Sequence, residues 1–329
     1  MPATRRPPPT PDVSFHVFAS RWYAEVEPAV RPKSAESLRW QLSHHLLPFF
    51  AEHLLDEITV AEVDRYRTEK LVEERLAASS INKTICLIGQ IMDAAVEREL
   101  VDRNPLWINR RRRLVRAAAP NGTHLARAVH IEALLDAAGE LDQEADHGHR
   151  SRRAMLSTLT FAGLRISELL ELHWADVDVN AGRLTVRRGK TPAAARELVL
   201  FPALTEELGM LRAVRPARGQ RHVFTGARGG RWTAENLRRR VLRPTVERAN
   251  ERLQADGNAT LPEPVTHHSL RRTFASLMFA LGYSPPEVME ALGHADPRVS
   301  LRVYARAMKR DAKEIERLRA LAGLTDDGA

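Results

Sequence analysis

Hydrophobic residues recur at helical spacing along the first third of the chain. Four helices are predicted, over about 13–27, over about 34–47, from residue 59 onward, and after residue 79 up to about residue 100. The third begins at Thr59, and Glu62 three residues later completes a capping-box pattern. The fourth carries an apolar stripe made up of Ile81, Ile85, Ile88, Met92, Val96 and Leu100. Cys86 falls inside it, where a buried structural thiol is expected. The pattern predicts a small all-helical domain over residues 13–105.

The pattern changes in the remainder of the chain, where helical and strand-like segments are mixed. Helices are predicted near 130–139, at 151–162, from 163 onward, and again beyond 205, including one that opens at Pro285-Pro286. Short strands are predicted over 176–179, 184–188 and 197–201, with tight connections between them. The expected second domain, over residues 130–329, is mixed α+β and mainly helical, with a small antiparallel sheet.

The segments outside these two domains have unusual compositions. Residues 1–12 contain five prolines, which predicts a flexible lead. The linker over residues 106–129 contains six arginines and no acidic residue: Arg110, Arg111, Arg112, Arg113, Arg116 and Arg127. Such a run can be an ordinary solvated surface or a strap that binds the phosphates of DNA.

A last apolar stripe lies near the end of the chain. It consists of Ile315, Leu318, Leu321 and Leu324 on an otherwise charged helix. The helix can pack on its own domain or dock onto a neighbouring protomer, and the pattern alone leaves both open.

Composition narrows the class of protein. The chain has 329 residues and a net charge of +8, one cysteine, and no apolar run long enough to cross a bilayer. The N-terminal stretch also lacks the apolar segment of a signal peptide. A disulfide scaffold, a membrane protein and a zinc finger are therefore set aside, and a cytoplasmic protein is expected. Arginine supplies nearly all the basic residues, so Lys190, alone between residues 84 and 308, stands out.

Four segments of the second domain carry candidate chemistry. They are TFAGLRISELLEL with Arg165 and Glu168, VRRGKTPAAARELVL with Lys190, THHSLRRTFAS with His268 and Arg271, and LGHADPRVSLRVYAR with His294 and Tyr304. In this order and spacing, the set resembles the tyrosine recombinases, the family of phage integrases and Xer proteins. The resemblance extends over roughly residues 13–320. It departs from the family where Ala162 replaces a common Thr and Ser269 a common Asp.

The resemblance implies a fold and a role for each residue. The fold would join an N-terminal helical, SAM-like core-binding domain to the recombinase catalytic domain. The catalytic residues would be Arg165, Lys190, His268, Arg271, His294 and Tyr304, with Glu168 in support. Tyr304 would be the nucleophile and Lys190 the general acid, with His268 as the general base. Arg165, Arg271 and His294 would stabilise the phosphate.

Elementary chemistry supports these roles independently. Arginine suits a pentavalent phosphorane because its planar fork donates two hydrogen bonds and stays charged. Tyrosine, with a pKa near 10, needs a neighbouring base or a strong positive field to become a nucleophile. No carboxylate cluster of the metal-binding type accompanies these residues. We expect a reaction without metal or other cofactor.

The expected function is therefore site-specific recombination or integration of double-stranded DNA. The resemblance implies a homotetramer on two DNA sites, with accessory DNA-bending or directionality proteins as further partners, and association with the bacterial nucleoid when bound. Further DNA contacts are expected from Arg238, Arg239 and Arg240. The short stretch before residue 13 favours a recombinase without an arm-binding domain. Two alternatives stay open: a type IB topoisomerase-like enzyme, and a catalytically idle DNA-binding protein of the same fold.

Overall fold

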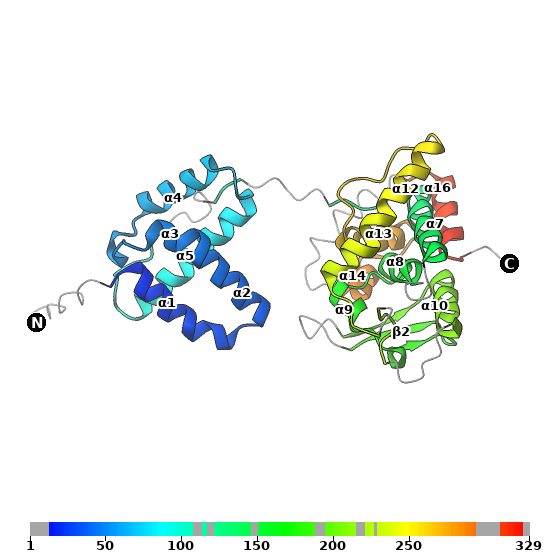
Figure 1. Ribbon diagram of the computed structural model, residues 1–329, viewed down its shortest axis with the longest axis horizontal. Helices are drawn as coiled ribbons and strands as arrows, with labels where there is room; N and C mark the ends of the chain where they lie inside the picture. Colours follow the sequence, from blue (N-terminus) through cyan, green and yellow to red (C-terminus); the bar gives the residue numbers. More distant parts are fainter. Residues whose placement is uncertain are drawn as a thin grey trace, which may run out of the picture. The chain divides into compact units, whose positions relative to one another are not determined.

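The computed structural model describes residues 13–107, 114–116, 122–145, 151–187, 195–214, 221–226, 229–293 and 310–324. The chain forms two compact units, Met1–Pro120 and Asn121–Ala329. Figure 1 shows helices in the first unit, and helices beside a small sheet in the second. No helix in the described ranges is both long and apolar enough to span a membrane.

The N-terminal unit is helical. Its elements are α1 (Phe15–Val26), η1 (Glu27–Ala29), α2 (Pro32–Gln41), η2 (Leu42–Leu46), α3 (Leu47–Phe50), η3 (Leu55–Glu57), α4 (Val60–Val72) and α5 (Ala78–Glu97). The helix predicted over 34–47 is longer in the structure, because α2, η2 and α3 follow one another without a break through Pro48. Proline cannot donate a backbone hydrogen bond, and the π-turn η2, closed by the Leu47 N–H on Leu42 O, lies directly before it.

Aromatic and aliphatic side chains fill the core of this unit. The ring of Phe50 lies between those of Phe15 and Tyr66, at centroid distances of 5.6 and 5.4 Å. The Tyr66 hydroxyl donates to Thr84 Oγ1 at 2.9 Å, which satisfies the buried phenol. The predicted stripe on α5 faces this core through Ile81, Ile85, Ile88 and Met92. Cys86 is only half-buried, so the expectation of a buried thiol is wrong: its position lies beside the stripe.

Thr59 caps α4, as the sequence predicts. Its Oγ1 accepts a hydrogen bond from the Glu62 N–H at 3.4 Å. The Glu62 carboxylate instead accepts from Arg65 at 2.6 Å and contacts His53 at 3.1 Å. The Glu62 carboxylate is therefore bound by these two side chains, and not by the start of the helix as the capping-box pattern predicts.

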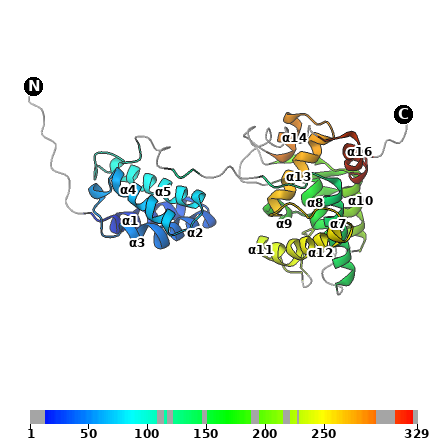
Figure 2. The same ribbon diagram turned by 90° about the horizontal axis from the view of Figure 1, so that it is seen from above.

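The C-terminal unit is built around α8. Its elements are α7 (Ala128–Glu144), α8 (Arg152–Phe161), α9 (Ile166–Leu170), η4 (Trp174–Asp176), β1 (Val177–Asp178), β2 (Arg183–Val186), β3 (Arg196–Val199), α10 (Pro202–Val214), α11 (Ala234–Leu237), η6 (Arg238–Leu242), α12 (Arg243–Ala255), α13 (His267–Ala280), α14 (Pro285–Leu292) and α16 (Ala312–Leu321). Helices α7, α10 and α13 all pack against α8, which is buried along most of its length (Figure 2). This packing fixes the end of α8, where the candidate site begins.

The three predicted strands form an antiparallel sheet in the order β1-β2-β3. Leu184 in the middle strand pairs with Val177 on one side and Leu198 on the other, and all three are buried. Alternate positions face solvent, as expected for a sheet covered on one face. The expected combination of a helical domain with a mainly helical α+β domain is confirmed.

The C-terminal helix α16 packs on its own unit. Leu318 and Ala322 are fully buried, and Leu321 and Leu324 pack against the same core. The Ala203 N–H donates to Ala322 O at 3.3 Å, which ties the end of α16 to α10. The structure therefore supports packing on the same chain, and a neighbouring protomer is not needed to bury this stripe.

Candidate active site

A left-handed glycine leads from α8 into the candidate site. Gly163 has a φ of +58°, and a Cβ at this position would lie 2.2 Å from Cδ1 of Phe274. A side chain there would be strained by the backbone and would collide with the aromatic ring. Ala162, the residue that replaces a common Thr, is fully buried. The turn directs the chain towards Arg165, which caps α9.

Arg165 is fixed by Glu168 and by the end of α14. The Arg165 N–H donates to Glu168 Oε2 at 2.8 Å, and its Nη1 donates to Oε1 at 2.7 Å. Its Nη2 donates to Gly293 O at 3.0 Å. The Arg165 side chain is 30% exposed and that of Glu168 only 3%. The guanidinium thus keeps an open face, while the carboxylate lies behind it.

Arg271 approaches the same carboxylate from α13. Its side chain is 2% exposed, and its Nη1 lies 3.9 Å from Glu168 Oε2. Nη1 also donates to Gly163 O at 2.6 Å, and Nη2 donates to Leu292 O. Two residues that are 106 positions apart in the sequence, Arg165 and Arg271, are therefore held around one acid.

A third arginine, which the sequence analysis did not single out, completes this cluster. Arg196, at the start of β3, donates from Nη2 to Glu168 Oε2 at 3.0 Å and from Nη1 to Oε1 at 3.3 Å. Its Nε donates to Ala291 O at 2.6 Å. The only hint in the sequence is an arginine at the first position of a short strand, followed by Glu197 and two apolar residues. Together, Arg165, Arg196, Arg271 and Glu168 form the arginine cluster.

The charges of the arginine cluster are strongly coupled. Burial favours a higher pKa for Glu168, but hydrogen bonds and positive charge from Arg196 and Arg165 outweigh it and hold the pKa below its ordinary value. Burial, followed by the nearby charge of Arg165, lowers the pKa of Arg271 to about 9. Glu168 is therefore ionised and Arg271 is still cationic at neutral pH.

His268 lies at the start of α13, on the same helix as Arg271. The helix is capped by Thr266 and Ser269: Thr266 Oγ1 accepts from the Ser269 N–H at 3.1 Å, and Ser269 Oγ accepts from the Thr266 N–H at 3.1 Å. His268 is exposed as a residue, yet partial burial of the imidazole lowers its pKa, as do the positive charges of Arg272, Arg271 and Arg165. A neutral imidazole at pH 7 can accept a proton.

The neighbouring His267 has a different environment. Its Nε2 is buried and forms no hydrogen bond within the described part of the chain. Burial and the charge of Arg238 lower its pKa, while the charge of Glu235 opposes this. The charges that act on this ring come from η6 and α11, whereas those that act on His268 come from Arg272, Arg271 and Arg165.

Several predicted site residues lie outside the described residues. They are Lys190, His294, Tyr304, Arg110, Arg111, Arg112 and Arg113. On either side of the segment 294–309, however, the chain is anchored. Gly293 accepts from Arg165, and Arg310 donates to Ala126 O, Ser276 O and Ser276 Oγ, each at 2.9 Å.

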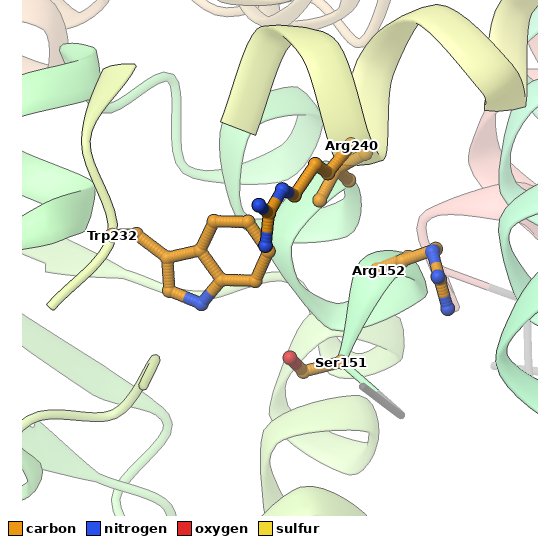
Figure 3. Close-up of a pocket in the computed structure, with 5 residues that line it drawn as sticks. Ser151, Arg152, Trp232 and Arg240 are labelled. Atoms are coloured by element: carbon orange, nitrogen blue, oxygen red, sulfur yellow. The ribbon is translucent and has the colours of Figure 1, made fainter. Parts of the chain in front are cut away.

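The arginines predicted to contact DNA differ in their surroundings. Arg116 and Arg239 are exposed, and Arg238 pairs with Glu235 at 2.7 Å. Arg240 lines a separate pocket of about 270 Å³, where Figure 3 shows its guanidinium beside the ring of Trp232. Of the three arginines on η6, Arg239 has the least restrained side chain within the described residues.

Comparison with known proteins identifies the family. Residues 127–310 match the phage integrase family, and residues 15–111 match the phage integrase central domain. The tyrosine recombinase XerC of Pelotomaculum thermopropionicum is 26% identical over 287 residues, or 83% of this chain and 87% of that protein. A putative prophage phiRv2 integrase of Mycobacterium tuberculosis is 26% identical over 329 residues, or 94% and 78%.

Solved structures share the fold. The Tn1549 transposon integrase in complex with a circular intermediate DNA has a TM-score of 0.71 at 16% identity, covering 88% of this chain and 98% of that one. A lambda integrase dimer bound to a core site has a TM-score of 0.69 at 17% identity, covering 91% and 79%. The resemblance found in the sequence is confirmed. The chain belongs to the phage integrase family of tyrosine recombinases, which are DNA strand transferases.

Proposed function

We propose that the protein is a site-specific recombinase that cleaves and rejoins duplex DNA through a 3′-phosphotyrosyl intermediate. The observation that carries the proposal is the convergence of Arg165 and Arg271 on one buried carboxylate, close to a histidine with a lowered pKa. Such a site presents fixed positive charge and a proton acceptor together, which phosphoryl transfer requires. The two structural neighbours, both bound to DNA, support the choice of substrate.

The first step breaks one phosphodiester bond and forms another. The phenolic oxygen of Tyr304 attacks the phosphorus, the P–O5′ bond breaks, and a 3′-phosphotyrosyl bond and a free 5′-hydroxyl result. Arg165, Arg271 and His294 stabilise the non-bridging oxygens as negative charge builds up on them. Glu168 supports the reaction by orienting Arg165, to which it is bound through both the backbone and the side chain.

Two protons move during this step. His268 accepts the phenolic proton of Tyr304, and Lys190 donates a proton to the departing 5′-oxygen. In the second step a 5′-hydroxyl of the partner duplex attacks the phosphotyrosine, and both proton transfers run in reverse. The energy of the phosphodiester is conserved in the covalent intermediate, so the proposed reaction needs no nucleotide cofactor.

Recombination exchanges both strands of two duplexes. With one protomer for each strand, the proposed assembly has four protomers. A lambda integrase tetramer bound to a Holliday junction shares the fold, with a TM-score of 0.68 at 16% identity. We also propose that the Arg-rich linker and the exposed arginines of η6 bind DNA phosphates. Phosphates are the same in every DNA sequence, so these contacts would add affinity without sequence specificity. Accessory DNA-bending or directionality proteins remain part of the proposal for the assembly.

The nucleophile can be tested with nicked suicide substrates, which trap the covalent intermediate. We expect Tyr304→Phe to bind duplex DNA like wild type and to form no covalent adduct in a denaturing gel, since only the attacking oxygen is lost. Tyr283→Phe is the matched control, because Tyr283 is a partly exposed tyrosine outside the cluster and should leave adduct formation unchanged. An adduct with Tyr304→Phe would show that another residue attacks.

The same substrates separate the alternatives. A recombinase given two cognate duplexes should produce four-way junctions and exchanged strands. A topoisomerase-like enzyme would instead relax supercoiled DNA without junctions, and an idle DNA-binding protein would give no adduct even as wild type. Wild-type junction formation that disappears in Tyr304→Phe is the result expected here.

A further inference from the structure

Arg196 is almost completely buried, and all three of its guanidinium nitrogens form hydrogen bonds within the protein. Its side chain is 4% exposed, and its two terminal nitrogens bind the two oxygens of Glu168 at 3.0 and 3.3 Å. This is the side-by-side geometry in which arginine binds a carboxylate most strongly. Arg165, by contrast, is 30% exposed and has a free edge. Of these two cations on Glu168, Arg165 is the one whose guanidinium is open to solvent.

Three arginines also hold the end of α14. The carbonyls of Ala291, Leu292 and Gly293 accept hydrogen bonds from Arg196, Arg271 and Arg165 in that order. The last carbonyls of a helix have no partner within it and carry partial negative charge, so cations are favoured there. All three arginines are joined again through Glu168. Helix α14 is therefore locked to the arginine cluster immediately before the segment that contains His294.

Charge gives Arg196 a second effect. With three guanidinium groups and one carboxylate, the arginine cluster has a net charge of +2. Without Arg196 this falls to +1, and the carboxylate is left to attract Arg165 and Arg271 alone. Both would then be drawn towards Glu168 and away from a phosphate in front of them.

We propose that Arg196 is a positioning residue for phosphate binding: it holds Glu168 and the end of α14 so that Arg165 and Arg271 face the scissile phosphate together. The inference rests on the proposed function, because it assumes a phosphodiester substrate. It adds a residue that touches neither the DNA nor the reacting atoms. Arg196 acts only through the groups it binds.

The first measurement is the single-turnover rate of covalent adduct formation at saturating enzyme. Arg196→Met removes the charge and the hydrogen bonds but keeps an unbranched apolar stem, and should slow cleavage about 10²-fold, the scale for groups that orient or electrostatically support reacting residues. Binding to uncleaved duplex should change less than about threefold, because the buried residue makes no phosphate contact. Arg183→Met is the matched control: Arg183 is an exposed arginine on the adjacent strand, paired with Glu197, and should cleave like wild type.

A second substrate distinguishes positioning from general loosening of the fold. A methylphosphonate at the scissile position removes the charge of one non-bridging oxygen, so the arginines have less negative charge to stabilise. On this substrate the defects of Arg196→Met and Arg165→Ala should both shrink several-fold. Equal impairment of Arg196→Met on both substrates would overturn the proposal, since a loosened site would be slow on either one.

Charge and geometry can also be separated. Arg196→Met combined with Glu168→Gln restores the net charge of +2 but not the contacts with α14, and should stay at least tenfold slower than wild type. Full recovery in the double variant would reduce Arg196 to a counter-charge and refute its positioning role. If Arg196→Met unfolds, Arg196→Lys serves instead: it keeps the charge, loses the fork, and should show an intermediate defect with the same reduction on methylphosphonate.

The control reactions keep this inference apart from the proposed function. Loss of all adduct in wild type, or an adduct with Tyr304→Phe, would refute the proposed function itself. A wild-type enzyme that cleaves through Tyr304 while Arg196→Met cleaves equally fast would refute only the role of Arg196.

Discussion

The two units of the chain differ in what they bury. The N-terminal unit packs aromatic and aliphatic side chains from α1, α3, α4 and α5, and its buried Tyr66 hydroxyl bonds a neutral partner, Thr84. Among its described residues the buried charged side chain is Lys70, and its partner Glu73 is 31% exposed. The C-terminal unit has an apolar core of its own, but it also encloses the arginine cluster, in which Glu168 and Arg271 are almost completely buried.

This difference separates stability from function. Each apolar group that is removed from water stabilises the fold, and any apolar side chain of suitable shape can contribute in this way. A buried ionic cluster gains little net stability, because desolvation offsets the attraction between the charges. The C-terminal unit thus maintains an arrangement that stability alone does not favour, at the place where the proposed phosphate binding requires fixed charge.

The largest effect on stability is expected in the apolar core. Ile88 is completely buried in the core. Ile88→Ala should therefore lower the free energy of unfolding of the N-terminal unit by about 4 kcal/mol. Val72→Ala, at a 78% exposed position on α4, should change it by less than about 0.5 kcal/mol. Denaturation followed by separate probes in each unit tests this. A shift of the C-terminal transition in place of the N-terminal one would contradict the comparison.

A slightly smaller effect is expected at the turn that leads into the candidate active site. Gly163→Ala adds strain at positive φ and a collision with Phe274, together about 3 kcal/mol in the C-terminal unit. Gly257→Ala is a close control, because Gly257 has a φ of +71° but no atom within 4 Å of an added Cβ, and should cost about 1 kcal/mol. Equal losses from the two substitutions, measured by chemical denaturation, would mean that the contact with Phe274 is unimportant.

The comparison also explains what the sequence could predict. Periodicity identified the stripe on α5 and the three strands, because burial of a whole face leaves a regular pattern. The expectation that Cys86 is buried came from its residue type, whereas its position directly after Ile85 is off the spacing of the stripe, and it is half-buried. Family motifs identified Arg165 and Arg271, which the structure brings together around Glu168. Arg196 has no such motif here, and its role depends on tertiary contacts with Glu168 and Ala291 that no local pattern records.

A moderate effect is expected from the cap of α13. Ser269 occupies the position of a common Asp, and its hydroxyl bonds the Thr266 N–H and Pro264 O, both at 3.1 Å. Ser269→Ala should therefore lower the free energy of unfolding of the C-terminal unit by about 1 kcal/mol. Ser167→Ala, at an exposed position on α9, should be nearly neutral in the same denaturation experiment. A neutral Ser269→Ala would mean that backbone contacts alone hold the start of α13.

The smallest effect is a shift in pH dependence caused by the charges around His268. Its pKa is lowered by partial burial and then by Arg272, Arg271 and Arg165, so the neutral form, which the proposed role as general base requires, persists below pH 6.5. Single-turnover cleavage should fall only as the pH drops through this lowered pKa, and Arg272→Met should move the midpoint to higher pH, because it removes a neighbouring positive charge. The sign for stability follows: the unfolded chain binds the proton more tightly, so the contribution of His268 to folding is lost as the pH falls. Arg183→Met, which is outside the cluster, should keep the wild-type midpoint. A midpoint that stays fixed in Arg272→Met, or moves to lower pH, would show that the acid limb belongs to a group other than His268.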